Sequence, residues 1–143
     1  MQKTVNHLLA EKGQEVWTIT PDATVYDALQ LMADKGIGAV VVIDEGGLAG
    51  ILSERDYARK VTLLHRGSRD TPVRDIMTAQ VFTVGRHQTV TDCMELMTDH
   101  HIRHLPVVED GELVGLVSIG DIVKAVISEQ AYLIKQLENY ITG

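Results

Sequence analysis

The alternation of apolar and polar residues along the chain predicts two copies of one β-α-β-β-α module. In the first copy a short extended piece, VWTIT, precedes residues 24–36, where apolar positions recur every three or four residues, as in a half-buried helix. Thr24 and Asp27 have the spacing of an N-terminal cap, and Gly36 is typical of a C-terminal stop. The apolar runs AVVVI and LAGIL around DEGG then indicate two strands and a turn, and a second helix is expected to begin at Ser53.

The same order of elements returns after a shift of 65 residues. Residues 16–61 align with residues 81–126 without a gap, and about a third of the aligned positions are identical. Gly-apolar-apolar-Ser-x-x-Asp therefore occurs twice, as GILSERD and GLVSIGD. A module of this size buries too little surface to be stable alone, so the two are expected to pack through their sheets in one α+β fold.

The repeat sets the predicted domain ranges. The first module with an N-terminal lead-in covers residues 1–61, a polar linker 62–72, the second module 73–127 and a C-terminal helix extension 128–143. VRDIM (73–77) resembles VNHLL (5–9), so each module is expected to begin with a similar lead-in. Along the last helix an apolar stripe of Val126, Leu133, Leu137, Tyr140 and Ile141 is too long to fold back on its own module, which predicts a homodimer.

Composition narrows the possible functions. The 143 residues carry a formal net charge of −7, which argues against broad nucleic-acid binding but leaves room for a small anionic ligand. Apolar runs are shorter than the roughly 20 residues that cross a bilayer, and the N-terminus lacks a signal-peptide pattern. The single cysteine, Cys93, lies in a helical pattern and cannot form a disulfide within the chain, which is typical of the reducing cytoplasm. A cytoplasmic protein without a membrane partner is therefore expected.

The Ser-x-x-Asp motif has two interpretations. Its spacing is that of a capping box, in which Ser and Asp bond to each other's backbone N–H at a helix start. The same helix start attracts phosphate, and a carboxylate in its first turn can accept hydrogen bonds from a ribose diol. The small residues Gly38, Ala39, Gly50 and Gly115 are expected to let a flat ring approach the backbone.

VRDIMT (73–78), IRHLPVVEDGELVGLVSIGDI (102–122) and IGAVVVIDEGGLAGILSERDY (37–57) together resemble a tandem cystathionine β-synthase (CBS) domain pair, or Bateman module. The resemblance covers most of the chain and, with no fused catalytic domain, implies a stand-alone regulatory protein rather than an enzyme. It implies binding of AMP, ADP, ATP, NAD or S-adenosylmethionine in clefts between the repeats, with the signal passed to an unknown partner protein.

The resemblance also implies roles for individual residues. Asp56 and Asp121 would hold ribose hydroxyls, while Ser53 and Ser118 would lie near phosphate or cap the helices. The remaining candidates border the adenine, face the ligand or lie beside the carboxylate; they are Thr18, Gly38, Ala39, Arg55, Thr83, Arg103 and His104. The copies differ, because Arg103 and His104 replace Gly38 and Ala39, and Pro106 replaces Val41. The two sites are therefore expected to be unequal.

Three other interpretations stay open. His100, His101 and His104 suggest a metal site, but no partner recurs at ligand spacing. A solvated helix end is the simpler interpretation of His100 and His101, and a phosphate neighbour that of His104. An enzyme is disfavoured because neither Ser-x-x-Asp has a nearby His and EGGLAG (45–50) is a turn rather than a dinucleotide-binding loop. The alternative from a third class is an interaction or scaffold module whose clefts are empty relics.

Overall fold

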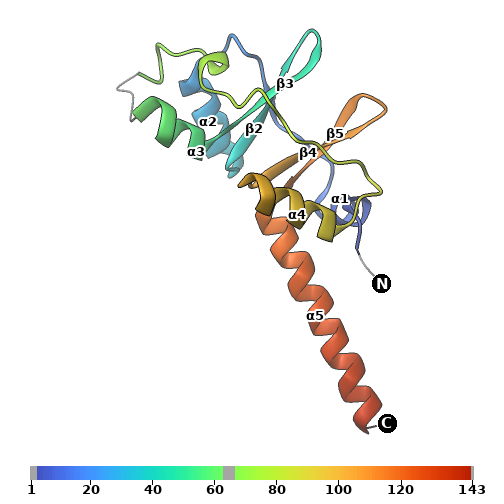
Figure 1. The fold of residues 1–143 in the computed structure, drawn as a ribbon. Helices are drawn as coiled ribbons and strands as arrows, with labels where there is room; N and C mark the ends of the chain where they lie inside the picture. Colours follow the sequence, from blue (N-terminus) through green and yellow to red (C-terminus); the bar gives the residue numbers. More distant parts are fainter. Residues whose placement is uncertain (1–2, 63–66, 143) are drawn as a thin grey trace. The chain divides into compact units, whose positions relative to one another are not determined.

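The computed structural model describes residues 3–62 and 67–142, so residues 63–66 of the predicted linker lie outside the described part. Helices and short strands alternate in the order that the repeat predicts (Figure 1). The α+β class, the two tandem modules and the long C-terminal helix are therefore confirmed. In chain order the elements are α1 (Val5–Lys12), β1 (Thr18–Ile19), α2 (Val25–Lys35), β2 (Ala39–Asp44), β3 (Gly47–Ser53), α3 (Glu54–Asp56), the π-helical turn η1 (Tyr57–Thr62), the 3-10 turn η2 (Val73–Asp75), α4 (Val90–His100), β4 (His104–Glu109), β5 (Glu112–Ser118) and α5 (Ile119–Thr142).

The helices that follow the first strands begin and end at the expected caps. The Thr24 hydroxyl accepts a hydrogen bond from the Asp27 N–H at the start of α2. In the second copy Thr89 caps α4 and its partner Asp92 completes the reciprocal capping box. Gly36 ends α2 in the left-handed region, and His101 takes the same conformation, with φ 55°, at the end of α4. The histidine at the second stop therefore bears a backbone strain that glycine avoids.

The first repeat builds a three-stranded sheet, in which β1 is parallel and β3 antiparallel to the central β2. The second repeat has only the two-stranded sheet of β4 and β5, and its expected first strand is reduced to one bridge between Val84 and Val107. The cause is Pro106. At the equivalent position the Val41 N–H donates to the Trp17 carbonyl at 3.2 Å, and proline has no N–H to make this bond.

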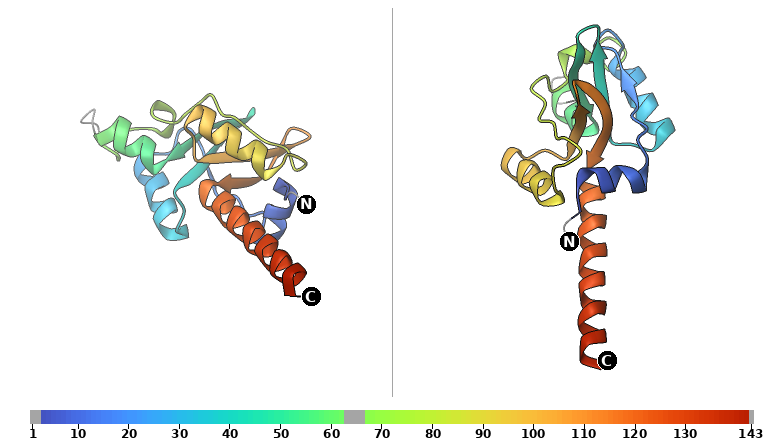
Figure 2. Two further views of the ribbon diagram at one scale, coloured as in Figure 1. Left: turned by 60° about the horizontal axis from the view of Figure 1, so that its bottom comes forward. Right: turned by 90° about the vertical axis from the view of Figure 1, so that its right-hand side faces the viewer.

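The chain divides into two compact units that do not follow the sequence ranges. One unit comprises residues 15–82 and 110–114, and the other residues 1–14, 83–109 and 115–143. The N-terminal lead-in, which contains α1, therefore belongs with the second repeat, whereas the lead-in that contains η2 belongs with the first. Each lead-in was expected to belong to the repeat that follows it in the sequence, but it groups with the other repeat. In both views of Figure 2, α1 lies beside the start of α5.

The two lead-ins use the same backbone contacts. In the first repeat the Val73 N–H donates to the Ala23 carbonyl at 2.8 Å. In the second repeat the Val5 N–H donates to the Gln88 carbonyl at 2.8 Å, and Gln88 follows Ala23 by the 65 residues of the repeat. The resemblance between VNHLL and VRDIM therefore reflects two equivalent docking segments, with each acceptor supplied by the loop before a capped helix.

The glycine in each Gly-apolar-apolar-Ser motif lies against a lead-in. A Cβ atom at Gly50 would lie 2.8 Å from the Met77 sulfur and 2.8 Å from the Thr78 carbonyl oxygen. A Cβ atom at Gly115 would lie 2.6 Å from Cδ2 of Leu9. The expectation that these two glycines admit a flat ligand ring is wrong, because protein atoms already fill the space above them.

Each unit has its own apolar core. Both cores combine one face of the capped helix with strand residues and with the docked lead-in, and both depend on branched aliphatic side chains rather than aromatic ones. In the first repeat the buried cluster consists of Val25, Ala28, Met32, Val40, Val42, Leu52, Val61, Val73 and Ile76. In the other unit the buried apolar residues include Val5, Leu8, Leu9, Val90, Cys93, Met97, Leu105, Val107, Val117, Ile122 and Ala125.

Candidate functional site

Both Ser-x-x-Asp motifs lie where a strand passes directly into a helix. The Ser53 N–H donates to Oδ2 of Asp56 at 3.0 Å, and the Asp56 N–H donates to the Ser53 hydroxyl oxygen at 3.1 Å. In the second repeat the matching distances between Ser118 and Asp121 are 2.9 and 3.2 Å. The capping-box interpretation is therefore confirmed at both sites. Because the cap fixes the carboxylate at the helix start, it also sets where a ligand could meet it.

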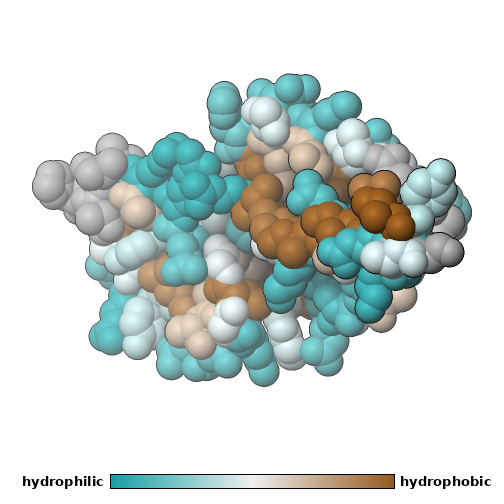
Figure 3. All heavy atoms as spheres, turned by 90° about the horizontal axis from the view of Figure 1, so that it is seen from below, coloured by the Kyte–Doolittle hydropathy of each residue, from teal (hydrophilic) through white to brown (hydrophobic). Residues whose placement is uncertain are grey.

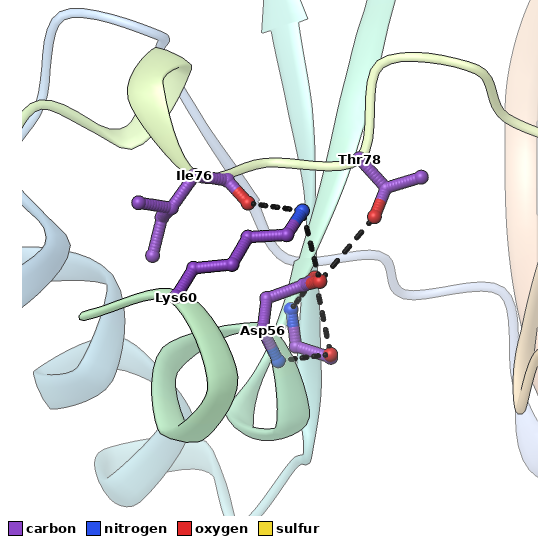
Figure 4. Close-up of polar contacts among 5 residues, drawn as sticks. Asp56, Lys60, Ile76 and Thr78 are labelled. Atoms are coloured by element: carbon purple, nitrogen blue, oxygen red, sulfur yellow. Dashed lines mark hydrogen bonds and ion pairs between the residues drawn. The ribbon is translucent and has the colours of Figure 1, made fainter. Parts of the chain in front are cut away.

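In the first repeat both oxygens of Asp56 have protein partners (Figure 4). The Thr78 hydroxyl, which follows η2, donates to Oδ1 at 3.3 Å, and Nζ of Lys60 lies 3.5 Å from the same oxygen. Lys60 also donates to the Ile76 carbonyl at 3.0 Å. The Asp56 side chain is 16% exposed, so the second lead-in and η1 together cover most of this carboxylate.

In the second repeat a lysine of the first lead-in contacts Asp121. Nζ of Lys12 donates to Oδ2 of Asp121 at 2.6 Å and to the Leu116 carbonyl at 2.7 Å. Burial alone would raise the pKa of Asp121, but the hydrogen bonds from Lys12 and Ser118 and the charge of Lys12 outweigh it and hold the pKa below its usual value. Asp121 therefore stays ionised in a half-buried position, as a diol-binding carboxylate must.

The two carboxylates differ in the oxygen that remains for a ligand. The Ser118 N–H and Nζ of Lys12 both contact Oδ2 of Asp121, whereas Asp56 is contacted at both oxygens, with Oδ1 held by Thr78 and Lys60. An ionised carboxylate oxygen has two acceptor positions, so Oδ1 of Asp121 can receive hydroxyl donors without breaking the contacts that Lys12 and the Ser118 N–H make with Oδ2. A ligand at Asp56 must instead share or displace the threonine and lysine contacts.

The loop residue implied to face the ligand is tied to the helix start in each repeat. The Glu54 N–H donates to the Gly38 carbonyl at 3.0 Å, and the Ile119 N–H donates to the Arg103 carbonyl at 2.8 Å. Gly38 and Arg103 therefore lie beside the first residue of α3 and of α5. Buried Ala39 pairs with Ser53 across β2 and β3.

The other candidates are placed less closely. Exposed Thr18 pairs with Val41, two residues along β2 from Ala39, and exposed Thr83 precedes the bridged Val84. Among the described contacts, neither threonine bonds to a helix start. Arg55 is half-buried within α3, Arg103 is exposed, and His104 is half-buried at the first position of β4. The structure thus groups Ser, Asp and the loop residue in each repeat, while the threonines lie on neighbouring backbone.

A shallow hollow of about 340 Å³ lies beside one of these groups. It is bounded by the end of α2, the loop before β2 and the first residue of α3, and it includes Gly38 and Glu54. Its volume falls in the range of small-molecule sites, but its walls are mostly aliphatic and Asp56 does not line it. Of the candidate site residues, Gly38 alone lines this hollow.

Metal and nucleophile chemistry receive no structural support. Across residues 3–62 and 67–142 no group of three His, Cys, Asp or Glu side chains is arranged to hold a metal ion. Cys93 is fully buried in α4, and burial together with the charge of Asp92 raises the pKa of its thiol to about 11. Such a thiol is almost entirely protonated at neutral pH and is a poor nucleophile.

Three residues beside the carboxylates were missed from the sequence. Lys12 reaches Asp121 across 109 positions, and Thr78 reaches Asp56 across 22. Lys60 follows Asp56 by four residues, a spacing at which an ion pair could have been expected. The resemblance between the two lead-ins was a signal for the other two, because equivalent segments were available to reach equivalent sites.

The fold and these paired sites define a class: two tandem α+β repeats, each with a capped carboxylate where a strand enters a helix. A family model of the CBS domain matches the chain twice, over residues 13–62 and 73–128. The chain belongs to the CBS-domain family, as its motifs predicted.

Relatives and solved structures agree with this assignment. CBS domain-containing protein CBSX3, mitochondrial, of Arabidopsis thaliana is 42% identical over 98% of this chain and 72% of its own length. YhcV of Bacillus subtilis is 35% identical over 76% of both chains. The solved CBS domain NE2398 is 50% identical with a TM-score of 0.85, covering 89% of this chain and 99% of its own. A CBS-domain protein of Burkholderia ambifaria, named provisionally for signal transduction, is 52% identical with a TM-score of 0.86, covering 90% and 96%.

One further relative combines such a region with an enzyme. Inosine-5′-monophosphate dehydrogenase of Korarchaeum cryptofilum is 38% identical over 85% of this chain, which corresponds to 25% of that enzyme. As for membranes, none of the helices within the described residues has the length and apolar character needed to span a bilayer.

Proposed function

We propose that this chain is a regulatory module without catalytic activity, which binds an adenine nucleotide at its capped helix starts and signals to a partner protein. The ligand class comprises AMP, ADP, ATP and NAD, with S-adenosylmethionine as a further member. Binding would favour one conformation of the chain over another through its differential affinity for the two, and the partner would respond to that change.

The observation that carries the proposal is the state of Asp121. Its carboxylate is 18% exposed and ionised, and Ser118 and Lys12 both fix it through the same oxygen, Oδ2. A vicinal diol such as that of ribose supplies two hydroxyl donors at the spacing that one carboxylate can accept. A structural cap alone needs only Oδ2, so the second oxygen is available for recognition.

The surroundings of this carboxylate suit a phosphate group. Arg103 precedes β4 and His104 is its first residue, and the Arg103 carbonyl accepts a hydrogen bond from the first N–H of α5. The dipole of a 24-residue helix favours an anion at the same end. In the first repeat Gly38 and Ala39 take these places, and both oxygens of Asp56 are held, so we propose that the second-repeat site binds more tightly.

The names of two relatives are consistent with this proposal. The Burkholderia protein is named provisionally for signal transduction, and the Korarchaeum protein is an enzyme of a purine nucleotide. The hexameric CBS-CP12 proteins of bloom-forming cyanobacteria are 28% identical, with TM-scores of 0.78 and 0.77, and they are oligomeric. These neighbours support association between copies of the chain, and we propose a homodimer as the working unit because the apolar stripe predicts one.

One observation favours the alternative, an interaction module with empty sites. The capping boxes explain Ser53, Asp56, Ser118 and Asp121 without any ligand, because each pair is satisfied within the chain. Under this alternative the chain would bind a partner protein directly, and no nucleotide would alter that binding.

Isothermal titration calorimetry with AMP, ATP and NAD separates these functions. Wild type should release or absorb heat with at least one nucleotide, and Asp121→Ala should weaken that binding about 10- to 100-fold, because hydrogen bonds to a charged group contribute about 1.5–3 kcal/mol. Asp34→Ala is the matched control, since Asp34 is an exposed carboxylate on α2. Absence of heat with all three nucleotides would support the interaction module, and turnover of the ligand on chromatography would indicate an enzyme.

A further inference from the structure

The C-terminal part of α5 is a helix without a covering surface in the described chain. From Gln130 to Thr142 every side chain is exposed, and the ribbon of this part runs clear of α1 and α4 (Figures 1 and 2). A helical segment of about this length is marginal in water when no tertiary contact supports it. An ordered helix here therefore requires a surface that packs against it.

Most of the exposed apolar residues of α5 recur with a seven-residue period along one side of the helix, while Ile119 and Tyr132 are exposed outside this set. Counting Val123 as position a of the heptad places Val126, Leu133 and Tyr140 at d. Leu137 is a second a position, and the neighbouring e positions are all isoleucine. We call this set the α5 stripe; it consists of Val123, Val126, Ile127, Leu133, Ile134, Leu137, Tyr140 and Ile141. A band of apolar side chains follows the visible face of α5 in Figure 3.

The area of the α5 stripe matches what a stable dimer requires. Seven of its members, all except Val126, are between 49% and 86% exposed. Together they offer on the order of 800 Å² per copy, which is about what each partner buries in a standard interface. The stripe is therefore large enough to hold two chains together on its own.

The charge of the extension favours a second copy of this chain. Beyond Asp121, α5 carries two lysines, Lys124 and Lys135, and two glutamates, Glu129 and Glu138. These charges cancel, although the whole chain has a formal net charge of −7. Two copies would repel each other least along α5, and a neutral apolar stripe with heptad spacing is complementary to itself.

One polar residue indicates how the two helices align. Gln130 occupies the a position between Val123 and Leu137, in the middle of the apolar stripe. In a parallel, in-register pair the two Gln130 amides would face each other and could hydrogen-bond, as single polar a residues do in coiled coils. In other alignments each amide would lie against apolar side chains and lose that partner.

We propose that two copies of the chain associate through a parallel, in-register pairing of their α5 stripes, with Gln130 facing Gln130 of the second copy. This inference names the surface and alignment of the homodimer in the proposed function. It does not require nucleotide binding, so the two can fail independently.

The test compares Leu137→Glu with Ser128→Glu by sedimentation equilibrium of the full chain. Both variants add one negative charge to α5, but Leu137 belongs to the stripe while Ser128 is exposed at an f position. Leu137→Glu should weaken dimerisation at least about 100-fold, because it buries an unpaired charge, and Ser128→Glu should remain dimeric. Far-UV circular dichroism and urea unfolding verify that the modules of both variants stay folded.

The alignment is tested with Gln130→Cys and Ser128→Cys under mild oxidation. Gln130→Cys should form a disulfide-linked dimer, because paired a positions bring the two Cβ atoms close together, whereas Ser128→Cys should not. The native Cys93 is fully buried and adds little background. A monomeric wild type, a dimeric Leu137→Glu or a failure of Gln130→Cys to cross-link would each overturn the proposal.

Discussion

Replacing Gly50 with alanine should destabilise the first repeat more than any other glycine-to-alanine change in a β-strand of this chain. The new Cβ would lie 2.8 Å from the Met77 sulfur and 2.8 Å from the Thr78 carbonyl oxygen, where ordinary contacts begin at about 3.4 Å. The Thr78 oxygen is backbone and accepts from the Ile51 N–H at 3.0 Å, while the Thr78 N–H donates to the Ile51 carbonyl at 2.9 Å. The methyl group therefore forces apart the pairing that docks the second lead-in.

The size of the effect follows from these contacts. Overpacking in a core typically costs about 1–3 kcal/mol, and weakening two backbone hydrogen bonds adds about 0.5–1.5 kcal/mol for each one that is lost. The lower backbone entropy of alanine in the unfolded chain returns about 0.5–1 kcal/mol. We expect Gly50→Ala to lower the free energy of unfolding by about 2–3 kcal/mol.

Urea unfolding followed by circular dichroism measures this loss. With a slope of about 2 kcal/mol per molar urea, the midpoint should fall by about 1–1.5 M. Gly115→Ala should cost less, because its clash is with the side-chain carbons of Leu9, which can rotate more readily than backbone can move. Gly46→Ala, whose nearest contact would be an ordinary 3.4 Å, is the control and should be nearly neutral. A Gly50→Ala midpoint equal to wild type, or above that of Gly115→Ala, would refute the docking of lead-ins over these glycines.

Three further predictions concern the helix ends and the second-repeat site. Lys12→Met should lower the free energy of unfolding by about 1 kcal/mol near pH 7, where solvent screens part of the ion pair. Because the pKa of Asp121 is lowered in the folded chain, this difference should persist above the ordinary pKa and vanish as acid protonates Asp121, which unfolding curves from pH 2 to 7 would reveal. His101→Gly should raise the midpoint of thermal unfolding, since it removes about 1 kcal/mol of left-handed strain; an unchanged midpoint would show that the histidine is not strained. Arg103→Ala should weaken AMP binding by about 1.5–3 kcal/mol in a calorimetric titration, and unchanged affinity would remove Arg103 from the phosphate site.

Local pattern was sufficient to predict most helices and strands. Thr24 and Thr89 begin their helices as the spacing requires, because a cap depends on residues three apart. The pairing of Ser53 with Asp56 and of Ser118 with Asp121 followed from the same rule. The sequence did not predict that the first strand of the second repeat would be reduced to one bridge, although Pro106 visibly replaces Val41. The effect of Pro106 depends on a hydrogen bond to a neighbouring strand, and residues next to Pro106 in the sequence do not specify that bond.

The contacts made by the lead-ins could not be derived from local pattern. Lys12 and Asp121 are 109 positions apart, and no periodicity relates them. The sequence predicted that Gly50 and Gly115 leave room for a flat ligand ring, but it did not show that Met77 and Leu9 occupy that room. Whether a ligand or the chain itself fills the space above these glycines depends on long-range packing, which local sequence pattern does not specify.

The central claim is that a duplicated carboxylate recognises a ribose diol, and the most direct measurement compares AMP with 2′-deoxy-AMP on wild type and Asp121→Asn. Wild type should bind AMP about tenfold or more tightly than the deoxynucleotide, since a hydrogen bond to a charged group is lost. Asp121→Asn should bind both ligands weakly and without preference. Equal affinity of wild type for the two nucleotides, or an undiminished preference in Asp121→Asn, would contradict the account.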